Sequence, residues 1–74
     1  MTVREKEAMS EAGKILKKLI AEDPVSLNDA FTQVNEQMAA MNAQKLRYKN
    51  FKQVVDDLLR SNDVVQRGDQ LQKP

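Results

Sequence analysis

Residues 26–60 read SLNDAFTQVNEQMAAMNAQKLRYKNFKQVVDDLLR, and this stretch decides the predicted fold. It contains no proline or glycine, and its apolar residues recur at gaps of three, four and seven. These residues are Leu27, Phe31, Val34, Met38, Met41, Tyr48, Val55, Leu58 and Leu59. Such spacing places them along one face of an α-helix. At a rise of ~1.5 Å per residue, the predicted helix would be about 50 Å long.

A shorter helix, of about residues 4–21, is predicted ahead of this stretch. Its glutamates Glu5, Glu7 and Glu11 come early and a group of lysines comes late, as the helix dipole favours: Lys14, Lys17 and Lys18. Gly13 interrupts its apolar stripe, at a cost of roughly 1 kcal/mol relative to alanine. Two interpretations remain open for Gly13: a tolerated surface glycine, or a point where another helix backbone comes close.

A turn over residues 22–26 separates the two predicted helices. Pro24 disfavours helix at the residue before it and has no backbone N–H to donate. Ser26 followed by Asp29 has the form of a capping box, which would start the second helix at residue 26. Alternatively, Asp23 caps the helix and Pro24 occupies its first position. Either start predicts an all-α antiparallel helical hairpin with a short first helix and a long second one.

The C-terminal sequence SNDVVQRGDQLQKP follows Arg60 and loses the helical period. It gains polar residues, Gly68 and a final proline, so residues 63–74 are predicted to form a flexible polar tail behind a hairpin domain of residues 1–62. Its three apolar residues could extend the helix only if a partner covered them.

The predicted hairpin cannot cover its own apolar face, because the first helix is too short. The residues expected to pack within the chain lie near the turn: Leu16, Leu19, Ile20, Leu27, Phe31, Val34, Met38 and Met41. The residues expected to contact another subunit or partner lie beyond the first helix: Tyr48, Phe51, Val55, Leu58 and Leu59. Burying one large apolar side chain stabilises a protein by roughly 1.5–3 kcal/mol, so this uncovered half predicts an oligomer.

The composition argues against catalysis. The chain has 74 residues and contains neither cysteine nor histidine, which removes the thiol nucleophile, the imidazole base and the commonest zinc ligands. Asp56 and Asp57 are adjacent in sequence, so on a helix they point about 100° apart and cannot share a proton. We therefore expect no catalytic residues, no cofactor and no metal.

A basic patch of Lys45, Arg47, Lys49 and Lys52 is interleaved with Tyr48 and Phe51. These cations could neutralise the phosphates of a nucleic acid. The aromatic residues continue the helical stripe, however, and the twelve basic and eleven acidic residues leave a net charge of only +1. We therefore favour packing of the aromatic residues against a neighbour over nucleic-acid binding.

Three short motifs are similar to those of the needle subunits of type III secretion systems: Asp23-Pro24, Asn42-Ala43-Gln44 and Lys49-x-Phe51-Lys52. In that family a proline-containing turn joins two helices, and paired aliphatic residues follow, as Leu58-Leu59 do here. The resemblance covers about residues 9–60. It implies a self-associating helical hairpin that builds a secretion apparatus. The chain departs from the family pattern in its tail, which continues past Arg60.

The sequence thus predicts a non-enzymatic, self-associating structural subunit. Two alternatives stay open: a dimeric helical adaptor that binds RNA or DNA through the basic patch, and a chaperone or partner subunit of a larger complex. The expected partner is a second copy or another helical protein. No apolar run is long enough for a membrane span or a cleavable signal. The localisation is open between cytoplasmic and, if the resemblance holds, exported without a cleavable signal.

Overall fold

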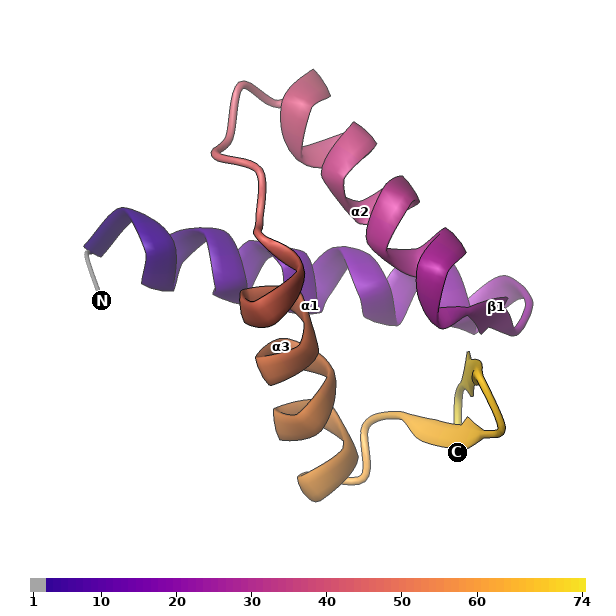
Figure 1. Ribbon diagram of the computed structural model, residues 1–74. Helices are drawn as coiled ribbons and strands as arrows, with labels where there is room; N and C mark the ends of the chain where they lie inside the picture. Colours follow the sequence, from indigo (N-terminus) through magenta and orange to yellow (C-terminus); the bar gives the residue numbers. More distant parts are fainter. Residues whose placement is uncertain (1–2) are drawn as a thin grey trace.

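A computed structural model describes residues 3–74 as three helices and a small sheet. The helices are α1 (Val3–Glu22), α2 (Leu27–Ala40) and α3 (Tyr48–Arg60). The strands are β1 (Val25–Ser26), β2 (Val65–Arg67) and β3 (Gln70–Gln72). Figure 1 shows α2 and α3 as separate helices that both pack against α1. The prediction of a mostly helical chain is confirmed, but the fold is not a two-helix hairpin.

The first turn of the chain lies close to its predicted position. Helix α1 ends at Glu22, and Ser26 caps α2 by accepting a hydrogen bond from the backbone N–H of Asp29 at 3.1 Å. Of the two starts open from the sequence, the structure takes the serine cap. Ser26 has extended backbone angles, so the same residue also ends strand β1.

The long helix predicted over residues 26–60 is wrong, because the chain leaves the helical conformation between Ala40 and Tyr48. The molecule measures 30 Å along its longest principal axis, which is too short for a helix of about 50 Å. Residues 41–47 form a connector that turns the chain back, so that α3 packs on α1.

Asn42 ends α2 by adopting a left-handed backbone conformation, with φ of 56°. Its N–H donates to the carbonyl of Ala39 at 3.1 Å, and the N–H of Ala43 donates to the carbonyl of Met38 at 2.8 Å. This pair of bonds is the Schellman motif, which satisfies carbonyls at a helix end. Asn62, with φ of 62°, ends α3 with the same pattern. Asparagine tolerates this conformation better than most residues, so two helices stop without glycine.

The flexible tail predicted for residues 63–74 is also wrong over residues 65–72, which form a β-hairpin. Gly68, with φ of 61°, supplies the left-handed conformation that the tight turn needs. Strand β3 lies between β1 and β2 and pairs antiparallel with both, with Leu71 opposite Val25 and Gln66. A further hydrogen bond, from the N–H of Leu27 to the carbonyl of Asp69 at 2.7 Å, ties the hairpin turn to the start of α2.

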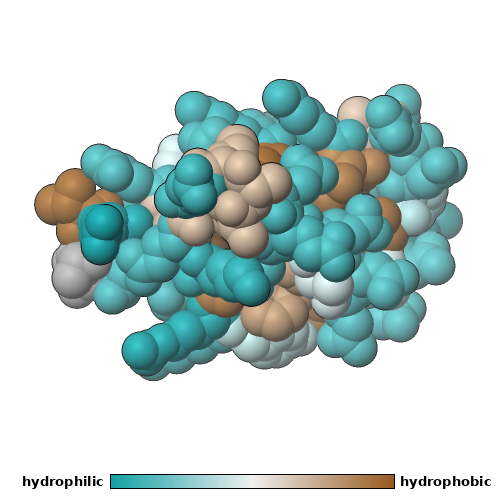
Figure 2. Space-filling view, turned by 90° about the horizontal axis from the view of Figure 1, so that it is seen from above, coloured by the Kyte–Doolittle hydropathy of each residue, from teal (hydrophilic) through white to brown (hydrophobic). Residues whose placement is uncertain are grey.

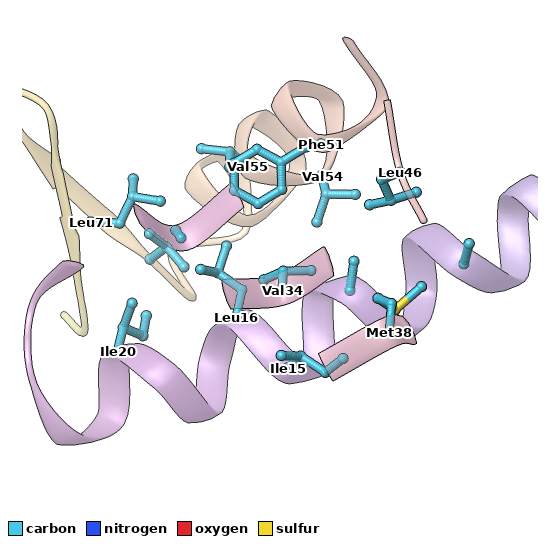
Figure 3. Close-up of a cluster of buried hydrophobic side chains, with 14 residues drawn as sticks. Ile15, Leu16, Ile20, Val34, Met38, Leu46, Phe51, Val54, Val55 and Leu71 are labelled. Carbon is cyan, nitrogen blue, oxygen red and sulfur yellow. The ribbon is translucent and has the colours of Figure 1, made fainter. Parts of the chain in front are cut away.

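One apolar core lies between the three helices and the hairpin (Figure 3). Its largest fully buried side chains come from every helix and from the C-terminal segment: Leu16, Val34, Met38, Phe51, Val55, Val64 and Leu71. The C-terminal segment therefore supplies part of the core that the predicted hairpin lacked.

Gly13 lies in this core where α1 packs against α3, and it is buried. A Cβ at this position would lie 3.7 Å from Cγ1 of Val54, an ordinary van der Waals distance. Gly13 is thus at a helix contact, as the second interpretation holds, but the contact leaves room for a methyl group.

Candidate functional site

The basic patch lies on the connector and on the first turns of α3. Lys45 and Arg47 belong to the connector, and Lys49 and Lys52 belong to the helix. The first three are exposed and Lys52 is half-buried. We call these four residues the basic surface.

The amino-terminal end of α3 is an unusual place for so many cations. The dipole of a helix makes this end partly positive, so acidic residues are stabilising there and basic ones are not. The first turn of α3 holds no acidic residue, and its N-cap residue, Arg47, makes no side-chain capping hydrogen bond. Unpaired backbone N–H groups and cations therefore converge on one end of the helix, an arrangement that suits an anion such as phosphate.

The rest of the outward face of α3 is polar. Phe51, Val54 and Val55 point into the core (Figure 3). Because successive residues of a helix are 100° apart, the opposite side of α3 carries a polar stripe. We call this the outward stripe: Lys49, Lys52, Gln53, Asp56 and Arg60.

The two aspartates of α3 differ in their partners. The side-chain amide of Gln53 donates to Oδ1 of Asp57 at 3.0 Å, and Nη1 of Arg60 lies 3.9 Å from the same oxygen. Within the described residues, neither Asp56 nor Lys49 makes a side-chain hydrogen bond or ion pair. Charged groups on the outward stripe are therefore left for solvent or for a ligand.

A hollow of about 250 Å³ adjoins the basic surface. It is lined from the connector, from the start of α3 and from one acidic residue of α1: Glu5, Gln44, Lys45, Leu46, Arg47, Lys49 and Asn50. Three of the four cations of the basic surface thus line one concavity, although they are spread over five positions in the sequence.

Asn35 of α2 holds the connector in place. Its side-chain carbonyl accepts from the N–H of Leu46 at 2.8 Å, and its amide donates to the carbonyl of the same residue at 3.1 Å. Leu46 itself is buried. Because one side chain satisfies both backbone groups of Leu46, the connector is fixed between two of the cations. No sequence pattern indicates this role, because Asn35 lies inside a helical pattern next to a packing position.

An aromatic cluster joins α2 to the start of α3. The ring of Phe31 lies 5.2 Å from that of Tyr48 in an edge-to-face arrangement and 5.3 Å from that of Phe51, measured between centroids. These distances are within the range that stabilises aromatic pairs. The cluster therefore sets how α3 is presented relative to α2.

The β-hairpin adds a cation that the sequence did not single out. Arg67 is exposed and lies next to the turn residue Gly68. The side-chain amide of Gln66 donates to the carbonyl of Gly68 at 2.9 Å, which braces the turn. The hairpin lies beside β1, near the start of α2 (Figure 1).

The residues predicted to contact another subunit do not form an uncovered apolar face. Phe51 and Val55 are fully buried in the core of their own chain, and Leu58 and Leu59 are half-buried against it. Tyr48 is 44% exposed but packs on Phe31. Because the connector brings α3 onto α1, the face predicted to be uncovered is covered within the chain. The face seen in Figure 2 is mainly hydrophilic, with small and interrupted apolar areas.

The residues predicted to pack within the chain lie at three levels of burial. Four of them are buried: Leu16, Ile20, Val34 and Met38. Another three are partly buried against the core: Leu19, Leu27 and Phe31. Met41 departs from the prediction and is 50% exposed, because it follows the end of α2 and begins the connector.

Residues 3–74 bring together no group of three or more acidic side chains that could hold a metal ion. None of the helices in this part of the chain is long and apolar enough to cross a lipid bilayer.

Comparisons with protein-family models, with curated proteins and with solved structures found no match to this chain.

Proposed function

We propose that this chain is a double-stranded DNA-binding domain of the winged helix-turn-helix class. In this proposal α2, the connector and α3 form the helix-turn-helix unit, and the β2–β3 hairpin forms the wing. No catalytic step is part of the proposed function.

The order of the elements supports this class. The chain runs α1-β1-α2-α3-β2-β3, and β3 lies between β1 and β2 in the sheet. A three-helix core with one strand before the second helix and a terminal hairpin is the arrangement of winged helix-turn-helix domains. The connector of residues 41–47 is longer than the three- or four-residue turn of the simplest helix-turn-helix motifs. Topology alone does not assign a function, so the surface must carry the proposal.

The observation that carries the proposal is the placement of cations at the start of α3. A protein gains no stability from four basic residues around a helix amino terminus, because the dipole there disfavours them. A phosphate backbone reverses that balance, since it brings negative charge to both the cations and the free N–H groups. Local arrangements that cost stability are expected at functional sites.

The favoured ligand is a B-form duplex. Its major groove is about 12 Å wide and admits an α-helix, whereas the corresponding groove of an A-form RNA duplex is too narrow and deep. The amino-terminal turns of α3 would enter the groove, as in other helix-turn-helix domains. Lys45 and Arg47 on the connector, with Arg67 on the hairpin, would contact phosphates.

The structural-subunit function expected from the sequence depended on a long helix with an uncovered apolar half. The described chain has no such helix, and four of the five side chains concerned are buried or half-buried within the chain, whereas Tyr48 is exposed. DNA binding is therefore the better supported proposal. Assembly into a needle or rod stays a prediction without a surface to carry it.

Fluorescence anisotropy of a labelled 20-base-pair duplex tests the proposal. Two variants that each lose four positive charges are compared with the unmodified chain. One changes the basic surface: Lys45→Gln, Arg47→Gln, Lys49→Gln and Lys52→Gln. The matched control changes four lysines of α1 instead: Lys6→Gln, Lys14→Gln, Lys17→Gln and Lys18→Gln. Glutamine has nearly the helix propensity of lysine, so both variants should fold, which circular dichroism checks.

The unmodified chain is expected to bind with an affinity that falls as salt rises, because bound counterions are released from the DNA. The basic-surface variant should bind roughly tenfold more weakly or worse, and its slope of log K against log salt should be smaller by about two, because the phosphate contacts of Lys45 and Arg47 are lost. The α1 control should lose far less. Equal losses in the two variants, or no binding by the unmodified chain, would contradict the proposal.

A further inference from the structure

Asp56 lies at the centre of the outward stripe and is exposed. Lys52 precedes it by four residues and Arg60 follows it by four, so both lie about one helical turn away on the same face of α3. The carboxylate of Asp56 therefore faces any ligand that lies between Lys52 and Arg60. It makes no hydrogen bond or ion pair with another described side chain.

Asp57 provides a natural comparison within the same helix. Its carboxylate accepts a hydrogen bond from Gln53 at 3.0 Å and lies 3.9 Å from the guanidinium of Arg60. It also lines a hollow between α1 and α3 together with Lys14 and Lys17. Its charge is thus partly matched within the chain and turned towards α1, whereas that of Asp56 is turned outwards.

We infer that Asp56 is a specificity-determining residue, which makes the domain select duplex sites with a cytosine opposite the middle of α3. The inference rests on the proposed function and names the base that this part of the helix prefers. Attraction between the cations and the DNA phosphates cannot select a base, whereas this acidic residue can.

The chemistry follows from what a free carboxylate can accept. An ionised aspartate has acceptors only, so it repels phosphates and the acceptor atoms at the edges of guanine and thymine. Cytosine presents its N4 amino donor in the major groove, and adenine presents an amino donor beside an acceptor. Cytosine is therefore the base that best replaces the water lost by the Asp56 carboxylate when DNA covers it, and other bases leave its charge unpaired.

The experiment is a selection from duplexes that carry twelve randomised base pairs, with sequencing of the bound fraction. The chain is used at full length in three forms: unmodified, Asp56→Asn and Asp57→Asn. Both variants remove one negative charge from neighbouring positions of α3, so a purely electrostatic effect would be similar in the two. Anisotropy with one mixed-sequence duplex gives their overall affinities.

In the bound fraction, the unmodified chain and Asp57→Asn should both favour cytosine at one position by roughly tenfold over each other base. Asp56→Asn should lose that enrichment while keeping its preferences at other positions, and it should bind the mixed-sequence duplex several-fold more tightly than Asp57→Asn does. Retention of the cytosine by Asp56→Asn, or equal profiles for the two variants, would overturn the inference. Binding without base preference in the unmodified chain would overturn it as well and leave DNA binding intact. Absence of any binding would instead refute the proposed function.

Discussion

Asn35 is the residue on which the presentation of the basic surface most depends. Its side chain pairs with both the N–H and the carbonyl of Leu46, at 2.8 and 3.1 Å. Leu46 is buried, so these backbone groups have little access to water as a substitute partner. The connector could not hold its course beside α2 without them.

We predict that Asn35→Ala lowers the free energy of unfolding by about 1–3 kcal/mol, because two part-buried backbone groups lose their partner. Chemical denaturation followed by circular dichroism measures the change. Asn28→Ala is the matched control, since Asn28 is exposed on the same helix, and its effect should stay within about 0.5 kcal/mol. Similar effects of the two substitutions would show that the Asn35 bonds do not hold the connector.

At the scale of elements, the end of α2 separates the observed fold from the long helix that the sequence predicted. Apolar residues keep helical spacing on both sides of the connector, so periodicity alone predicts one helix that runs through it. The signal for the break was Asn42, one of the few residue types that tolerate the left-handed conformation at a helix end. Asparagine occurs in many other settings, so this signal is weak without glycine or proline.

Substitutions at Asn42 distinguish the observed fold, in which α2 ends at this residue, from the continuous helix predicted over residues 26–60. The two are expected to respond with opposite signs. In the observed fold Asn42→Gly should be more stable than Asn42→Ala by about 1 kcal/mol, because alanine is strained at φ of 56°. In a continuous helix alanine would be the more stable by a similar amount. Thermal and chemical unfolding of both variants measures the sign.

The same pair at Asn50, inside α3, serves as the control. There alanine should be the more stable residue in either structure. An alanine preference at both positions would contradict the break between α2 and α3.

The β-hairpin was missed for a related reason. Its strands Val65–Arg67 and Gln70–Gln72 are three residues each, too short to show an alternating pattern. The tail contains apolar residues, but their partners lie far away in the sequence. Leu71, for example, pairs with Val25. Only the folded chain brings these segments together.

At the scale of the whole molecule, the sequence predicted the helical class, the first helix and the cap at Ser26. It also singled out the four basic residues of the surface, as part of an alternative function. It could not place them, because their common hollow depends on the connector, on Asn35 and on the packing of α3 against α1. The self-covering core likewise depends on Phe51 and Leu71, distant in the sequence, being buried in one cluster.

The molecule also offers two surfaces that carry cations for a direct comparison. The solvent face of α1 carries exposed lysines at Lys14 and Lys18, while the connector and α3 carry the basic surface. A ligand attracted by positive charge alone would bind to both surfaces. A ligand that fits the start of α3 would bind to the basic surface only.

Amide chemical shifts during titration of the isotope-labelled chain with an unlabelled 16-base-pair DNA duplex test the central claim most directly. We predict the largest shift changes at residues 45–53, smaller changes at residues 66–68 on the hairpin, and little change along the solvent face of α1. Shift changes centred on α1 would contradict the proposed interface. So would an absence of shift changes at duplex concentrations that saturate ordinary DNA-binding domains.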